Sequence, residues 1–294
     1  MILKEVRNNK LSSYFIISIF VIVVMLLVYF ICYCFNFGIM SVVIAVLFAS
    51  ISAIASYYNC DKIVLSINGA REATEEQDQL LSTVLDNLCI ASGLPRPKLY
   101  VIDDPSPNAF ATGRNPEHAV ICVTTGLLEK MNKYELEGVI AHELSHIKNY
   151  DILLSTIISV FVGFIVIVAD LIFRTSWIRD SDEDNKVGFI LQLVGLVFLL
   201  LSPLFATLMQ LAISRKREYL ADSSSVEMTR NPEGLISALQ KLSQDTENLK
   251  TANKATAHMY IVNPLAGERK KKQSSLFSTH PPIEERIARL QNIN

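Results

Sequence analysis

The sequence predicts a predominantly helical membrane protein in which four transmembrane helices carry one α+β domain. The first observation is composition: 50% of the 294 residues are hydrophobic and the mean hydropathy is +0.32, which is high for a soluble protein. The second is that long uncharged stretches alternate with stretches of ordinary polarity. The third is that the polar stretches hold both helix and strand patterns, separated by Gly and Pro.

Charge and cysteine content argue against several other classes of protein. The net charge is −2 and the isoelectric point is near 6.2, so no overall basic field favours nucleic acid. No two cysteines form a C-x-x-C pair and their number is odd, which argues against a disulfide framework and a cysteine zinc site. A reducing compartment around the polar part fits this pattern. The cysteines are Cys32, Cys34, Cys60, Cys89 and Cys122.

Residues 1–58 are predicted to be a two-helix membrane anchor. Charge is absent from Leu11 to Cys60, a run much longer than the apolar part of a cleaved signal peptide. As one helix the run would be about 75 Å long, whereas the hydrocarbon core of a bilayer is about 30 Å thick. It therefore has to fold back, and Asn36-Phe37-Gly38 is the expected break between spans at 12–33 and 39–58.

Residues 59–151 are predicted to form the first part of the polar domain. A capping pattern at Thr74 begins a helix that ends at Gly93. A strand is expected at 98–102, after two prolines that forbid further helix.

A hairpin follows, formed by residues 107–113 and a strand at 119–123. Its first strand is a candidate sheet edge, exposed and able to bind an extended peptide by strand addition. An ordinary meander without a binding role is the alternative. The candidate substrate-binding residues are Asn108, Ala109, Phe110, Ala111 and Thr112.

The predicted site is built around the H-E-x-x-H sequence from His142 to His146. A helix is expected here from Asn132, which can cap it, to about Asn149. Histidines four residues apart project from one helix face, so both rings can reach one zinc ion that keeps a position open for water. Glu143 lies beside that face and can take a proton from the water. Two solvated histidines on a surface helix are the alternative, because so short a pattern also occurs by chance.

Residues 152–214 are predicted to form a second membrane hairpin. Spans are expected at 152–169 and 187–214, the latter kinked near Pro203. The acidic segment 180–184 between them is interpreted as a solvated loop rather than a calcium site, because it lacks the glycine and final glutamate of an EF-hand.

Basic residues predict that both termini of the chain are cytoplasmic. Three precede the first span and three more, at 215–217, follow the fourth. Four spans return the chain to the side that it left. The segments 59–151 and 215–294 can therefore build one domain on that side.

A third ligand is expected after the fourth span, where Glu218 and Asp222 are four residues apart on a predicted helix. Two histidines and a glutamate form a standard catalytic zinc set. Ligating histidines usually donate their second N–H to a carboxylate, and Asp222 is the candidate. The alternative to a metal ligand is that Glu218 and Asp222 are an acidic pair on the helix surface, neutralised by Arg215 and Arg217. The H-E-x-x-H sequence on the same predicted membrane side favours the ligand.

Four blocks of the chain together resemble the HtpX-type membrane zinc metalloproteases, which are relatives of the CAAX prenyl proteases. The resemblance covers essentially the whole length and rests on residues 107–113, 142–149, 217–222 and 279–286. It implies an α+β zincin-like metalloprotease domain that faces the cytoplasm, with one zinc ion per chain. It also implies that His142, His146 and Glu218 bind the zinc, that Glu143 is the base, and that Asp222 supports the ligands.

The remaining histidines and one basic segment receive weaker interpretations. In its family-like context, His280 can donate a hydrogen bond to the developing oxyanion, with Arg286 helping to fix its segment. A loop histidine packed on prolines is the equal alternative. His118 and His258 have no partner at metal-binding spacing and are expected at the surface. The segment 268–275 is expected to be a solvated loop, with contact to anionic lipid as the minor alternative.

The sequence therefore predicts a zinc-dependent endopeptidase of the cytoplasmic membrane. By the family resemblance, it cleaves misfolded or surplus membrane proteins in quality control, with zinc-bound water attacking the peptide carbonyl and Glu143 as general base. Expected partners are membrane-protein or peptide substrates and the lipid bilayer, not nucleic acid, and the oligomeric state is left open. The alternatives are a CAAX-type prenyl-peptide protease and a non-catalytic zinc-binding adaptor. A transporter would need ionisable groups in its spans, which contain none.

Overall fold

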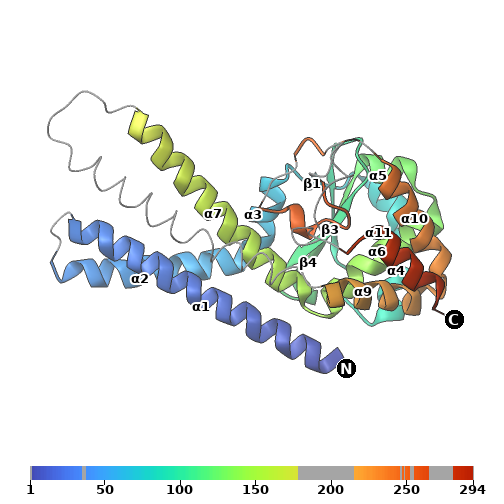
Figure 1. The fold of residues 1–294 in the computed structure, drawn as a ribbon, viewed down its shortest axis with the longest axis horizontal. Helices are drawn as coiled ribbons and strands as arrows, with labels where there is room; N and C mark the ends of the chain where they lie inside the picture. Colours follow the sequence, from blue (N-terminus) through green and yellow to red (C-terminus); the bar gives the residue numbers. More distant parts are fainter. Residues whose placement is uncertain are drawn as a thin grey trace.

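Among the residues that it describes, the computed structural model has three long helices, which lie to one side of a domain that contains the sheet (Figure 1). The predictions made for 180–184, 187–214, 268–275 and His280 lie outside the described residues. The structure describes residues 2–34, 38–177, 215–245, 247, 249–251, 255–264 and 281–293.

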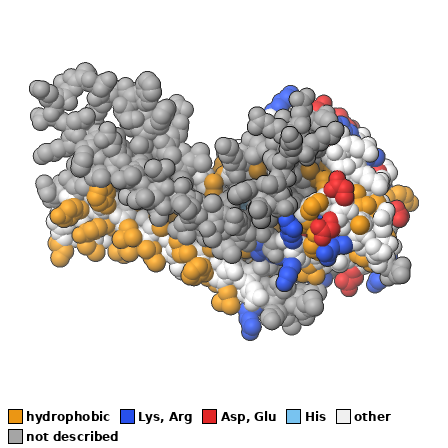
Figure 2. Space-filling model, viewed as in Figure 1, with side chains coloured by type: hydrophobic (Ala, Val, Ile, Leu, Met, Phe, Trp, Pro, Cys, Tyr) orange, Lys and Arg blue, Asp and Glu red, His pale blue; other side chains and the backbone are white. Residues whose placement is uncertain are grey.

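The first two helices, α1 (Ile2–Cys34) and α2 (Met40–Tyr58), match the predicted membrane anchor. Both are long and apolar enough to span a membrane, α1 over Val6–Phe30 and α2 over its whole length. Gly38 lies between them at a φ of +58°, a conformation that glycine adopts at no steric cost. Hydrophobic side chains cover the outward face of these helices (Figure 2), as expected for contact with lipid.

The third long helix, α7 (Asp151–Trp177), covers the predicted third span. It follows α6 (Lys133–Lys148), and the axes of the two helices differ by 84°. Among the described residues, two helices qualify as spans by themselves, and a third only if this bent pair counts as one broken span. Four transmembrane helices therefore stay a prediction.

Within the described part of the chain, the sheet has four strands in the order β1-β2-β4-β3. Strand β3 (Ala109–Gly113) forms the predicted hairpin with β4 (Ala119–Thr124). Strand β2 (Lys98–Ile102) runs parallel to β4, so the strands do not form an ordinary meander. The two-residue strand β1 (Arg71–Glu72), which no sequence signal indicated, lies at one edge and β3 at the other.

Helix α4 (Glu75–Ser92) begins and ends where its local signals predicted. Thr74 accepts a hydrogen bond from the backbone N–H of Gln77, whose side chain accepts one from Thr74 N at 3.1 Å. Gly93 ends the helix at a φ of +71°. The shorter helices are α3 (Cys60–Ile67), α5 (Thr125–Lys130), α9 (Arg215–Thr229), α10 (Pro232–Gln244) and α11 (Ile283–Gln291), with 3₁₀ turns at Pro116–His118 and Ala257–Met259.

Helix α6 is the central element of the domain and packs on β3 and on α4, α9 and α10. Its predicted apolar stripe, which includes Leu136, Ile140 and Leu144, is buried in the core. Close packing on α10 depends on Gly138, because a Cβ there would lie 2.7 Å from the backbone nitrogen of Leu235. The core therefore holds one face of α6 in place, and His142 and His146 lie on another face of the helix.

Glu135 links the start of α6 to α10. Asn132 caps the helix and donates its backbone N–H to the Glu135 carboxylate at 2.7 Å, while Ser237 and Lys241 donate at 2.6 and 2.7 Å. Burial raises the pKa of Glu135, but the hydrogen bonds from Lys241, Ser237 and Asn132 outweigh it, so the net pKa lies below its usual value.

We expect Glu135→Gln to lower the free energy of unfolding by about 1–3 kcal/mol near neutral pH, because hydrogen bonds to a charged acceptor are lost. Since the folded state lowers this pKa, the carboxylate contributes its stability above pH 4.5, its ordinary pKa, and loses it as the pH falls through the folded value. The difference in unfolding free energy between wild type and Glu135→Gln should therefore become smaller below pH 4.5. Denaturant unfolding at several pH values measures this. Glu137→Gln on the same helix is the control, and an equal effect there would contradict the assignment.

Candidate metal centre

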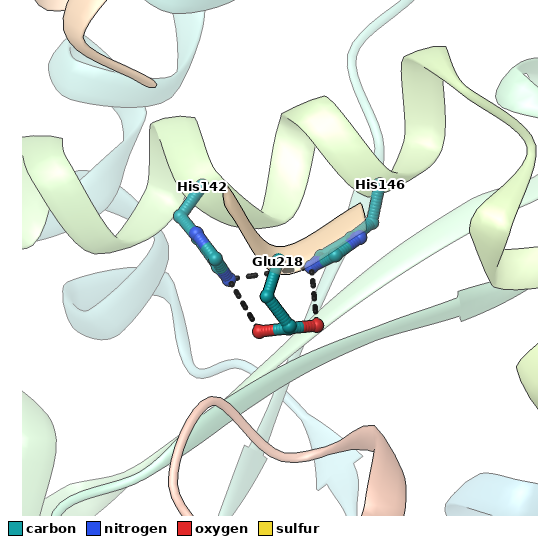
Figure 3. A group of neighbouring side chains, drawn as sticks. All are labelled: His142, His146 and Glu218. Atoms are coloured by element: carbon teal, nitrogen blue, oxygen red, sulfur yellow. Dashed lines mark hydrogen bonds and ion pairs between the residues drawn. The ribbon is translucent and has the colours of Figure 1, made fainter. Parts of the chain in front are cut away.

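Two elements that are distant in the sequence bring the three predicted ligands together. His142 and His146 project from α6 toward Glu218 on α9 (Figure 3). The Nε2 atoms of the histidines lie 3.2 Å apart. The Glu218 carboxylate lies 3.7 Å from Nε2 of His142 and 3.6 Å from Nε2 of His146. The ligand atoms of all three residues lie within 4.8 Å of one another, so they could hold one metal ion.

These separations fit zinc. Ligand atoms placed on a tetrahedron with bonds of about 2.0–2.1 Å lie about 3.3–3.4 Å apart, close to the observed 3.2, 3.6 and 3.7 Å. Two imidazoles and one carboxylate form a donor set that suits this ion and leaves a fourth position open. Both the distances between the ligand atoms and their chemical types therefore fit a zinc ion.

Each histidine is held by a carboxylate on its other ring nitrogen. Asp222 Oδ1 lies 3.0 Å from Nδ1 of His142, as the sequence predicted. Asp151 Oδ2 lies 3.0 Å from Nδ1 of His146. These contacts turn both Nε2 atoms toward Glu218. Asp151 was not singled out from the sequence, where it directly precedes the predicted span at 152–169.

Arg286 lies behind this arrangement, fully buried on α11. Its Nε and Nη2 donate to the two oxygens of Asp222 at 2.9 and 2.6 Å, and Nη1 donates to the Ile261 carbonyl at 3.2 Å. Burial raises the pKa of Asp222, but the charge of Arg286 and the hydrogen bonds and charge interactions with His142 and Arg286 together outweigh it and lower the pKa overall. Arg286 was expected to fix the segment of His280, whereas the contacts described here are to the support of His142.

Glu143 is buried at the same centre. Its pKa is raised to about 7, chiefly by burial, while His146 lowers it and Glu218 raises it. A carboxylate whose pKa lies near neutrality is suited both to accept a proton and to return it. Burial lowers the pKa of His142. For His146, the hydrogen bond with Asp151 and the negative charges of Glu218, Asp151 and Glu143 together outweigh burial and raise the pKa to about 9.

A pocket opens beside the centre and contains a histidine that was expected elsewhere. Its lining includes Glu143, His146 and Glu218 of the centre, together with His258 and Met259. The expectation that His258 is a surface residue is wrong, since it is 5% exposed and its Nε2 lies 3.3 Å from the carbonyl oxygen of Ser155. The reason is that residues 255–261 run back over β3, as the hydrogen bond from Ile261 N to Ala109 O shows. His118 is exposed, as predicted.

The candidate edge strand is buried rather than exposed. All five residues from Asn108 to Thr112 are buried. The Ala109 carbonyl accepts from Ile261 N at 2.9 Å, and Gly113 N donates to Thr156 Oγ1 at 3.2 Å. Ala111, between them, lines the pocket with Glu143. Strand β3 lies at a sheet edge, as proposed, but its residues are buried, and a role in substrate binding stays a prediction for them.

Comparisons with known proteins agree with this geometry. Residues 75–294 match the family described as Peptidase family M48. The chain is 46% identical over 296 residues to "Protease HtpX homolog" of Dictyoglomus turgidum, covering 98% of this chain and 93% of the relative. It is 43% identical over 302 residues to "Protease HtpX homolog" of Lactobacillus helveticus, covering 100% of both.

A solved structure shares the fold. It is titled "Crystal Structure of S. mikatae Ste24p", and it matches with a TM-score of 0.50 and 21% identity over 98% of this chain and 67% of that one. The full-length relatives and the family match establish more than the fold. The chain therefore belongs to peptidase family M48 and is an HtpX-type membrane metalloprotease.

Proposed function

We propose that this metalloprotease is a zinc-dependent endopeptidase of the cytoplasmic membrane that cleaves misfolded or surplus membrane proteins. The observation that carries the proposal is the convergence of His142, His146 and Glu218 beside the buried Glu143. The donor set favours zinc over harder ions that prefer oxygen ligands.

Zinc bound there supplies Lewis acidity to a peptide carbonyl and lowers the pKa of a water molecule toward neutrality. Glu143 takes a proton from the attacking water and then passes it to the leaving amine. Its pKa of about 7 suits both transfers. Asp222 and Asp151 hold the two imidazoles in one orientation.

The position of the site supports substrates drawn from the membrane. Helix α7, which covers the predicted third span, begins five residues after the ligand His146, so the pocket adjoins a long apolar helix. Residues Asp151, Ile152 and Ser155 of α7 line that pocket. The basic residues that flank the predicted spans support a cytoplasmic orientation.

A cleavage assay tests the proposal. The purified full-length protein in detergent is given either an unfolded model membrane protein or a prenylated CAAX peptide, with zinc, with a chelator, or with zinc restored after the chelator. We expect cleavage of the membrane protein that the chelator abolishes and zinc restores. Cleavage of the prenylated peptide alone would favour the rival substrate class. Zinc binding without cleavage of either would favour the adaptor.

A further inference from the structure

The junction between α6 and α7 is sharply bent and lies next to the metal centre. The chain turns by 84° between Lys148 and Asp151. Tyr150, within the turn, has a φ of +60°, which residues with a side chain adopt uncommonly. His146 lies just before the bend, and Asp151, which contacts His146 Nδ1, lies just after it. The geometry of this bend therefore sets where the His146 ring points.

The bend is contacted by the N-terminal helix α1, which lies beside α7 (Figure 1). Asn9 on α1 is only 4% exposed. Its side-chain N–H groups donate to the carbonyl oxygen of Asn149 at 2.9 Å and to Asp151 Oδ1 at 2.6 Å. The next residue, Lys10, places its Nζ 3.9 Å from the centre of the Tyr150 ring.

The same side chain of Asn9 also contacts the other ligand-bearing helix. Its Oδ1 accepts a hydrogen bond from Arg217 Nη1 at 3.2 Å, and Arg217 directly precedes Glu218. Arg217 Nε in turn lies 3.7 Å from Asp151 Oδ1. The Asn9 side chain thus donates hydrogen bonds to the segment that follows His146 and accepts one from the segment that carries Glu218.

We propose that the N-terminal membrane helix is a positioning element of the metal centre and acts through Asn9. By holding one oxygen of Asp151, Asn9 fixes the carboxylate whose other oxygen contacts His146. By accepting from Arg217, it ties α9 to the same point. This inference rests on the proposed metal site, and it predicts that a change in α1 alters the affinity of the protein for metal.

Asn9→Ala should weaken zinc binding by about 10–100-fold, the range typical of the loss of a group that orients a metal ligand. The readout is the zinc dissociation constant of the full chain in detergent, from competition with a chromophoric chelator. Asn8→Ala is a matched control, because Asn8 is the same residue type one position earlier and is exposed. The absorption spectrum of the cobalt-loaded protein should change in Asn9→Ala and not in Asn8→Ala.

Asn9→Asp separates positioning from packing. The aspartate keeps the shape and the acceptor of Asn9, but it cannot donate to Asp151 and adds a second negative charge beside it. We expect Asn9→Asp to weaken zinc binding at least as much as Asn9→Ala, and it serves as the test of the proposal if Asn9→Ala does not fold. In an Asp151→Asn background, the effect of Asn9→Ala should largely disappear. Zinc affinity and cobalt spectra equal to wild type in Asn9→Asp would overturn the proposal. Wild-type protein that binds no zinc would instead overturn the proposed function.

Discussion

Glu143→Gln is expected to abolish measurable proteolysis while the protein keeps its metal. The amide cannot accept the proton of the attacking water, and a general base typically contributes about 10²–10⁴ in rate. The ligand atoms belong to other residues, so zinc content should stay at the wild-type level. Steady-state kcat/KM on a cleavable substrate and metal analysis of the same preparation measure the two quantities together.

The control for this change is Glu137→Gln, six residues earlier on α6 and not one of the cluster residues. It should leave both kcat/KM and zinc content unchanged. If Glu143→Gln kept wild-type activity, Glu143 would not be the base. If it lost zinc as well as activity, the loss of cleavage would say nothing about proton transfer.

Arg286→Ala is expected to cause the largest loss of stability, about 3–5 kcal/mol in the free energy of unfolding, because it leaves a buried carboxylate without its partner. Arg286 is fully buried and donates twice to Asp222. Metal affinity should fall too, because Asp222 holds His142. Denaturant unfolding in detergent and chelator competition measure the two effects.

Two further variants separate the causes of these losses. Arg289→Ala, on the same helix, removes an arginine whose side chain is 57% exposed and should change the stability by no more than about 1 kcal/mol. Asp222→Asn with Arg286→Met removes both charges and should recover much of the stability. Metal affinity should stay low in the double variant, since His142 has lost its carboxylate. Full stability in Arg286→Ala alone would contradict the importance assigned to this ion pair.

Features whose causes are local in the sequence were predicted with nearly correct boundaries. The capping boxes at Thr74 and Asn132 form between residues three apart, so they can be recognised without tertiary structure. The end of α4 at Gly93, which has a left-handed backbone conformation, can also be recognised locally, as can the four-residue spacing of His142 and His146. The position of Glu218 beside them could be proposed because few donor sets suit zinc.

Features that depend on tertiary structure were missed. A charged residue before an apolar run resembles a membrane boundary, and only the bend at Tyr150 turns Asp151 back toward His146. That bend contains neither glycine nor proline. Asn9 had no reason to stand out in the polar segment before the first predicted span, since its partners lie more than 130 residues away. His258 is buried because its own segment, residues 255–261, crosses β3, which no spacing in the sequence reveals.

The most direct test is the zinc content of three purified proteins: wild type, Glu218→Ala and Glu227→Ala. Glu227 lies on the same helix as Glu218 but is exposed, so its loss leaves the donor set intact. If α6 and α9 share one ion, wild type and Glu227→Ala should retain about one zinc per chain after dialysis, and Glu218→Ala should lose it. Full zinc content in Glu218→Ala would contradict a metal centre shared between these two helices.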